Sequence, residues 1–204
     1  MGDILLHDGD LPDDLALGEV VAIDTETMGL NPHRDRLCLV QLTDGAGDIH
    51  LVKIAPGQTE APNLTAMLED PGRLKLFHYG RFDIAVMFHT FNVLTAPVYC
   101  TKIASKLVRT YTDRHGLKNL VSEILQVDLS KASQSSDWGA PDLAEAQLSY
   151  AADDVRYLHA LRDTLDQRLE REGRTELAQA CFEFLPARAL LDLSGWAEPD
   201  IFDH

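Results

Sequence analysis

The chain has 204 residues and a formal net charge of −15, with 33 acidic residues against 18 lysines and arginines. Its composition, 45% hydrophobic and 25% charged, is typical of one globular domain with a sizeable core and excludes a disordered or collagen-like chain. No apolar run approaches the roughly 20 residues that span a bilayer, and the acidic start does not resemble a signal peptide, so membrane insertion and secretion are disfavoured.

The first half of the chain predicts strands followed by alternating helices and strands. Apolar runs predict strands at 19–24, 37–43 and 49–54, which are expected to form an antiparallel meander with a turn at 44–48. A short helix at 62–68, a strand at 74–78, a helix at 81–91 and a brief strand at 98–100 are expected next. This order favours an α/β fold in which helices pack on a mixed sheet.

The second half is predicted to be helical. Helices are expected at 101–108, at 117–125, at 143–172 and at 174–191, with Gly173 separating the last two. The polar, serine-rich stretch 130–139 is expected to be an ordered loop or a lid. The tail from 181 to 202 is unusually apolar for a terminal segment. It either folds back onto its own domain or is buried against a neighbouring subunit.

The cysteines and the charge pattern restrict the compartment and the partners. Cys38, Cys100 and Cys181 are far apart and form no C-x-x-C pattern, so they favour a reducing cytoplasm and predict neither disulfides nor a zinc site. The acidic balance by itself argues against long nucleic acids, because a polyanion repels their phosphates. Residues 101–118 are an exception, with five basic residues and one acid, and form either a solvated helix face or a phosphate-binding strip.

Acidic residues occur near the ends of two predicted central strands. Asp24 and Glu26 follow an apolar run, and residues two apart on a strand point to the same face. Asp83 lies in the first turn of the helix after the strand at 74–78, at the edge where open α/β sheets keep their binding sites. The alternatives are a solvated turn for the first pair and a favourable helix dipole interaction for Asp83.

A tyrosine and a carboxylate share one face of a predicted C-terminal helix. Tyr150 and Asp154 are four residues apart, which places them one above the other. Asp153 is rotated from Asp154 by about 100° and lies off the face of the tyrosine. The alternative is a core tyrosine whose hydroxyl is merely hydrogen-bonded.

Four carboxylates in one cleft require cations. Several like charges at close range cannot all stay ionised, so Asp24, Glu26 and Asp83 together with Asp154 are predicted to bind metal. Ligation by oxygen alone indicates Mg²⁺ or Mn²⁺ rather than zinc. Two such ions form the recurrent site for phosphodiester hydrolysis.

The order D-x-E, then Asp, then Y-x-x-x-D is more specific than its parts. With the motifs IDTET, FHYGRFD, KASQSSDW and YAADDVRYL, it resembles the DEDD-type 3′-to-5′ exonucleases of the tyrosine subclass in the ribonuclease D group, over about residues 20–161. The segments PHRDRLCLVQL, CTKIASKLVRTYTDRHGLK and FLPARALLDLSGWAEPDIF extend this to a resemblance with the nano-RNase C family of alphaproteobacteria over nearly the whole chain.

The resemblance implies a fold and an activity. The expected fold is the ribonuclease H-like exonuclease fold, a mixed central sheet flanked by helices. One domain is expected over 1–204, with a helical part from about 174 and without the HRDC domains of ribonuclease D. The implied activity is hydrolysis of very short RNA to mononucleotides, above all dinucleotides such as the linear product of cyclic di-GMP. The implied assembly is a ring-shaped homo-octamer.

The resemblance also implies residue roles. Two divalent cations would be held by Asp24, Glu26, Asp83 and Asp154, and Tyr150 would position the attacking water or help to deprotonate it. The substrate contacts implied are Thr27, Met28, Gly29, Leu30, His78, Phe82, Lys131, Gln134, Ser135 and Trp138. Ribonuclease D carries an arginine where Ser135 stands, and a buried strand residue is the alternative for His78.

Two other functions compete. The first is a DNA-directed 3′-to-5′ exonuclease acting on single strands or duplex ends, because the same metal cleft hydrolyses either polymer and nothing in the sequence visibly reads a 2′-hydroxyl. The second is a catalytically idle oligomeric binding module, against which the intact set of four acids and a tyrosine argues.

Overall fold

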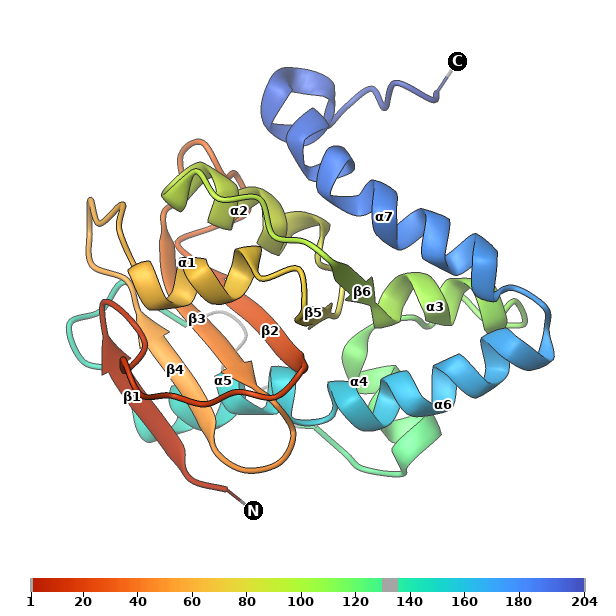
Figure 1. Ribbon diagram of the computed structural model, residues 1–204, viewed down its shortest axis with the longest axis horizontal. Helices are drawn as coiled ribbons and strands as arrows, with labels where there is room; N and C mark the ends of the chain where they lie inside the picture. Colours follow the sequence, from red (N-terminus) through yellow and green to blue (C-terminus); the bar gives the residue numbers. More distant parts are fainter. Residues whose placement is uncertain (1, 130–135, 204) are drawn as a thin grey trace.

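A six-stranded mixed sheet forms the centre of the computed structural model, which describes residues 2–129 and 136–203 (Figure 1). The strand order is β1-β4-β3-β2-β5-β6. The strands are β1 (Ile4–Asp8), β2 (Val20–Thr27), β3 (Leu37–Thr43), β4 (Ile49–Lys53), β5 (Leu74–Phe77) and β6 (Val98–Cys100). The antiparallel meander predicted from the sequence is present as β2-β3-β4, and β5 and β6 extend the sheet in parallel from β2.

Strand β1 was not expected from the sequence. It pairs in parallel with β4, with Ile4 opposite Ile49 and Asp8 opposite Lys53. Its five residues include no fully buried side chain, so the local pattern lacks the apolar run that predicts a central strand. Only its pairing with β4 in the folded protein identifies it as an edge strand of the sheet.

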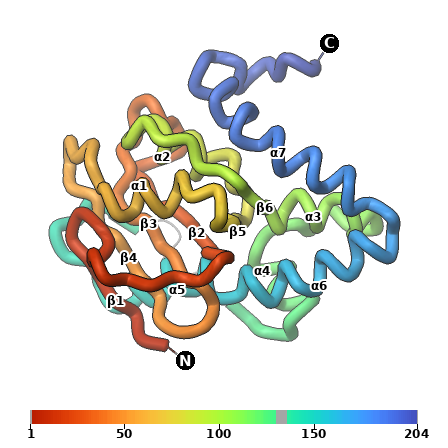
Figure 2. Tube along the Cα trace, in the orientation of Figure 1, coloured from red at the N-terminus to blue at the C-terminus, as the bar shows by residue number. Residues whose placement is uncertain are grey.

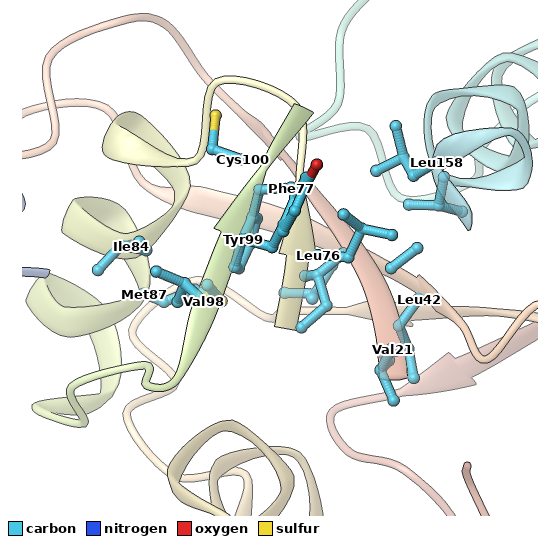
Figure 3. Close-up of a cluster of buried hydrophobic side chains, with 14 of the residues drawn as sticks. Val21, Leu42, Leu76, Phe77, Ile84, Met87, Val98, Tyr99, Cys100 and Leu158 are labelled. Carbon is cyan, nitrogen blue, oxygen red and sulfur yellow. The ribbon is translucent and has the colours of Figure 1, made fainter. Parts of the chain in front are cut away.

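Helices cover both faces of the sheet and gather beside β6. In Figure 1, α1 (Pro62–Glu69) and α2 (Arg81–Phe91) lie in front of the sheet, and α5 (Glu145–Arg156) lies behind it. Side chains of β5 and β6 lie between Ile84 and Met87 of α2 on one side and Leu158 on the other (Figure 3). The helices α3 (Thr101–Val108), α4 (Leu117–Leu120), α6 (Leu158–Arg171) and α7 (Thr175–Leu191) complete the fold, and α4 continues into the π-helical turn Val121–Leu125.

The single helix predicted at 143–172 is wrong, because the chain breaks at Tyr157 into α5 and α6. No proline or glycine marks the break. The break allows α5 to pack against β2, β3 and β4 while α6 turns to pack against α3. Tertiary packing therefore overrides a continuous helical pattern here.

The C-terminal segment leaves the body at the end of α7. Helix α7 packs against α2 and β6, and a π-helical turn, Asp192–Trp196, follows it. Gly195 has φ 99°, a left-handed conformation that glycine adopts without strain and that redirects the chain. The trace then runs to the C-terminus beyond α7 (Figure 2). No helix in the described part of the chain is long and apolar enough to cross a membrane.

Candidate active site

The predicted carboxylates come from three elements and meet in one cleft. Asp24 and Glu26 lie on β2, just before an irregularity in its pairing with β3, Asp83 lies in the first turn of α2, and Asp154 lies on α5. One carboxylate oxygen from each of Asp24, Glu26 and Asp154 lies within 4.8 Å of the others. The cleft that all four acids line, together with Tyr150, has a volume of about 890 Å³.

Hydrogen bonds fix the orientation of two of these acids. The hydroxyl of Thr25 donates to Asp83 Oδ1 at 2.6 Å, which joins α2 to β2 at the site. The amide of Gln41, directly opposite Asp24 on β3, donates to Asp24 Oδ2 at 3.4 Å. The geometry of the acid cluster is therefore set by the sheet and by two helices packed on it.

The acids cannot all be ionised without a counter-charge. Burial raises the pKa of Glu26 to about 9, and repulsion from Asp154 and Asp83 adds to this effect. Burial and the same neighbours raise the pKa of Asp24 well above its usual range, and burial raises the pKa values of Asp83 and Asp154 too. Because the donor set is oxygen only, the cluster fits a hard divalent cation such as Mg²⁺.

Tyr150 lies one turn before Asp154 on α5 and lines the same cleft. Burial, followed by the negative charges of Asp154 and Glu26, raises the pKa of its phenol above the usual value near 10. The hydroxyl therefore stays protonated at neutral pH and can act as a hydrogen-bond donor. Asp153, the rival of Asp154 in the sequence, instead accepts a hydrogen bond from Arg156 at 3.1 Å and does not line the cleft.

The remaining predicted contacts fall into three groups. Thr27, Leu30, His78 and Phe82 line the cleft, and the side chain of Leu30 is 86% exposed. Met28, Gly29 and Trp138 do not line it, although the Trp138 ring is buried with its centroid 6.2 Å from that of Tyr150. Lys131, Gln134 and Ser135 lie outside the described residues.

His78 is neutral in this setting. Its Nδ1 lies 2.9 Å from the Thr101 hydroxyl, and burial lowers the pKa of the imidazole to about 3. It can therefore offer a hydrogen bond at the cleft but no positive charge.

Several cleft residues escaped the sequence analysis. Tyr79 has φ 70°, uncommon for a residue other than glycine, and its exposed ring lies under Lys102 Nζ at 3.7 Å from the ring centroid. A wall of the cleft also contains Arg81 and, from the C-terminal segment, Asp192, Leu193, Ala197 and Glu198. The motif FHYGRFD contains Tyr79 and Arg81 and could have indicated them. No local sequence pattern, however, connects the C-terminal segment with the site.

The basic stretch 101–118 is not a continuous exposed strip. Arg109 is fully buried, forms an ion pair with Glu123, and donates hydrogen bonds to the Ser105 hydroxyl at 3.1 Å and to the Arg114 carbonyl at 2.8 Å. Its role is structural, since a buried guanidinium needs such partners. Among the basic residues of this stretch, Lys102 approaches the cleft through its contact with Tyr79, and the apolar Leu117 lines the cleft itself.

Known proteins resemble this chain over most or all of its length. Residues 10–170 match the family model described as 3′-5′ exonuclease. The chain is 58% identical to Brucella melitensis NrnC bound to pGG, with all of both chains covered and a TM-score of 0.95. The same protein with bound Mg²⁺ gives a TM-score of 0.94. These likenesses confirm the ribonuclease H-like exonuclease fold expected from the sequence.

The ribonuclease D proteins are more distant. The chain is 38% identical to ribonuclease D of Gluconacetobacter diazotrophicus over 76% of its own length, and 29% identical to the solved structure of Escherichia coli RNase D over 84%, with a TM-score of 0.73. It spans only 39% of the first relative and 45% of the second.

Proposed function

Because this chain belongs to the 3′-5′ exonuclease family, we propose that it degrades short oligoribonucleotides, above all dinucleotides such as the linear product of cyclic di-GMP, to mononucleotides. The observation that carries this proposal is the full-length likeness to an NrnC solved with pGG, combined with an acidic cleft of about 890 Å³. This volume lies within the range of pockets that bind small ligands.

The cluster supports the catalytic roles that the family resemblance implies. Asp24, Glu26, Asp83 and Asp154 would hold two divalent cations, Mg²⁺ or Mn²⁺. When bound, such ions lower the pKa of a coordinated water and stabilise the charge that develops on the leaving oxygen. The Tyr150 phenol, kept protonated by its surroundings and hydrogen-bonded to Asp154, would position the attacking water. Thr25 holds Asp83 in place for this work.

The cleft offers apolar, aromatic and cationic contacts for a short substrate. Leu30 and Phe82 supply apolar surface for a base, and the exposed ring of Tyr79 supplies a second such face. Lys102 places a positive charge over that ring, where a substrate phosphate gains an attractive partner in an otherwise acidic cleft. Thr27 and His78 add hydrogen-bonding groups. Contacts from Lys131, Gln134 and Ser135 stay predictions.

We also propose that the protein acts in the cytoplasm as a homo-oligomer, an octamer by its resemblance to nano-RNase C. Its three cysteines are free, which suits a reducing compartment. Side chains of the C-terminal region, Phe184, Trp196, Ile201 and Phe202, are 40–69% exposed. Apolar surface of this kind is typical of a contact with another subunit.

The decisive experiment compares turnover of a 5′-phosphorylated RNA dinucleotide, the matched DNA dinucleotide and a long RNA, each with Mg²⁺ and with Mn²⁺. The proposal requires the RNA dinucleotide to be the best substrate by kcat/KM. Preference for the DNA substrates would support the DNA-directed alternative, and no hydrolysis of any substrate would support an idle binding module.

A further inference from the structure

The C-terminal segment forms part of the catalytic cleft, although it lies outside the sheet and beyond the catalytic motifs. Asp192, Leu193, Ala197 and Glu198 line the same cleft as the four metal-facing acids. We call residues 192–198 the tail wall. A wall made by a terminal segment needs an anchor, because such segments are otherwise poorly held.

Two arginines anchor the tail wall to the body of the protein. Arg81, the first residue of α2, donates two parallel hydrogen bonds to the Asp192 carboxylate, and the one from its terminal nitrogen measures 2.6 Å. Arg188 of α7 contacts the same carboxylate at 2.9 Å and donates to the Trp196 carbonyl at 2.9 Å. It also reaches Asp200 at 3.3 Å. Bidentate pairs of this kind fix geometry as well as charge.

This anchor pairs the guanidinium of Arg81, a positive charge that would otherwise be free at the cleft. The Arg81 guanidinium is only two residues from Asp83, yet it is neutralised by Asp192. Its role is therefore to position the tail wall rather than to bind phosphate. Leu193 adds apolar bulk to the same wall.

Glu198 gives the tail wall a negative charge that no cation balances. Its side chain is exposed at the cleft, and none of the described residues forms a salt bridge or hydrogen bond with it. A strand long enough to reach this wall would bring a phosphate toward that carboxylate, and like charges at an interface are disfavoured.

We propose that the tail wall, held by the Arg81–Asp192 pair and by Arg188, limits the length of the RNA that the cleft accepts, through obstruction and through the charge of Glu198. The inference deepens the proposed function and rests on it. Arg81 and Asp192 are positioning residues, and Glu198 is the residue that discriminates against additional phosphates.

The test measures kcat/KM for an RNA dinucleotide and for an RNA pentanucleotide in matched variants of the full chain. In Glu198→Gln, the pentanucleotide-to-dinucleotide ratio should rise by about tenfold, because one repulsive charge is removed at unchanged shape. The control is Asp203→Asn, which removes an exposed carboxylate of the same tail that does not line the cleft, and it should leave the ratio unchanged.

A second pair of variants tests the anchor. Arg81→Ala should raise the same ratio and speed hydrogen exchange of the backbone amides in 192–203, whereas Arg81→Lys should restore both readouts partly. Faster exchange with an unaltered ratio, or unaltered exchange, would overturn the anchor's role. If Arg81→Ala does not fold, Glu198→Gln decides alone, and an unchanged ratio there overturns the proposal.

The wild-type protein separates this inference from the proposed function. No preference for the dinucleotide over the pentanucleotide in the wild type contradicts the proposed function, and the length limit falls with it. A clear wild-type preference that survives in Glu198→Gln and Arg81→Ala contradicts the tail wall alone.

Discussion

The two sides of the cleft are built in different ways. The four acids of the cleft stand on β2, α2 and α5, which are packed on one another in the core. The tail wall contains no buried residue and is held by ion pairs from Arg81 and Arg188. Groups that must be placed within a fraction of an ångström sit on rigid elements. The tail side consists instead of a peripheral segment that side-chain ion pairs hold against the body of the protein.

The acid side should lose its chemistry without losing its fold. Replacing Asp24 or Asp154 with Asn is expected to abolish hydrolysis, because a metal ligand supplies several kcal/mol of transition-state stabilisation, or about 10³-fold or more in rate. The metal-free variant should be as stable as the wild type or slightly more stable, since one repulsive charge is gone. Steady-state turnover and urea unfolding check both statements. Substantial activity in either variant would remove the metal assignment.

Tyr150 lies on the acid side of the cleft but is not proposed as a metal ligand, so its replacement tests the chemical step separately from metal binding. Changing Tyr150 to Phe should lower kcat by roughly 10²-fold, the usual scale for a positioned proton-transfer or orienting group. KM should change little, because the ring still packs near Trp138. Mg²⁺ affinity, measured by calorimetry, serves as the control and should stay the same. A rate close to that of the wild type would reduce Tyr150 to a packing residue.

The tail side should affect access and assembly rather than the chemical step. Deleting residues 193–204 removes most of the tail wall together with Trp196, Ile201 and Phe202, which are exposed in the single chain. Light scattering should then show smaller species, and dinucleotide turnover should fall by severalfold rather than disappear. A truncated protein with the full-length mass would show that this tail does not support the oligomer.

The smallest expected effect is a pH dependence of stability confined to the acid side. Glu26 has an ordinary pKa of 4.5 that burial raises to about 9 in the folded state. The metal-free folded protein therefore binds more protons than the unfolded chain between these values, and this contribution to stability is lost as pH rises through that window. Urea unfolding with a chelator, at about pH 5 and about pH 8.5, should show the loss, which Mg²⁺ and Glu26→Gln should both reduce. If the free energy of unfolding changed equally with pH in the presence and in the absence of Mg²⁺, the assignment of this pH dependence to the acid cluster would be wrong.

Local sequence patterns were sufficient to predict those elements whose own residues show the period of a strand or a helix. The apolar runs of β2, β3 and β5 and the four-residue spacing of Tyr150 and Asp154 predicted both the elements and the acids they carry. These signals survive without tertiary information because the periods of strands and helices decide which side chains share a face. The family resemblance, by contrast, placed Met28 at the substrate, where the structure shows an exposed side chain outside the cleft lining.

The sequence by itself determined the fold class, the order of the central elements along the chain and the acids that these elements carry, because these depend on short-range spacing. Only the tertiary structure decided that β1 pairs with β4, that the helical segment breaks at Tyr157, and that Arg109 is buried. It alone brought Arg81 to Asp192, 111 residues away, and so made the tail a wall of the cleft. Contacts between distant segments depend on how whole layers pack, and no local period in the sequence records that packing.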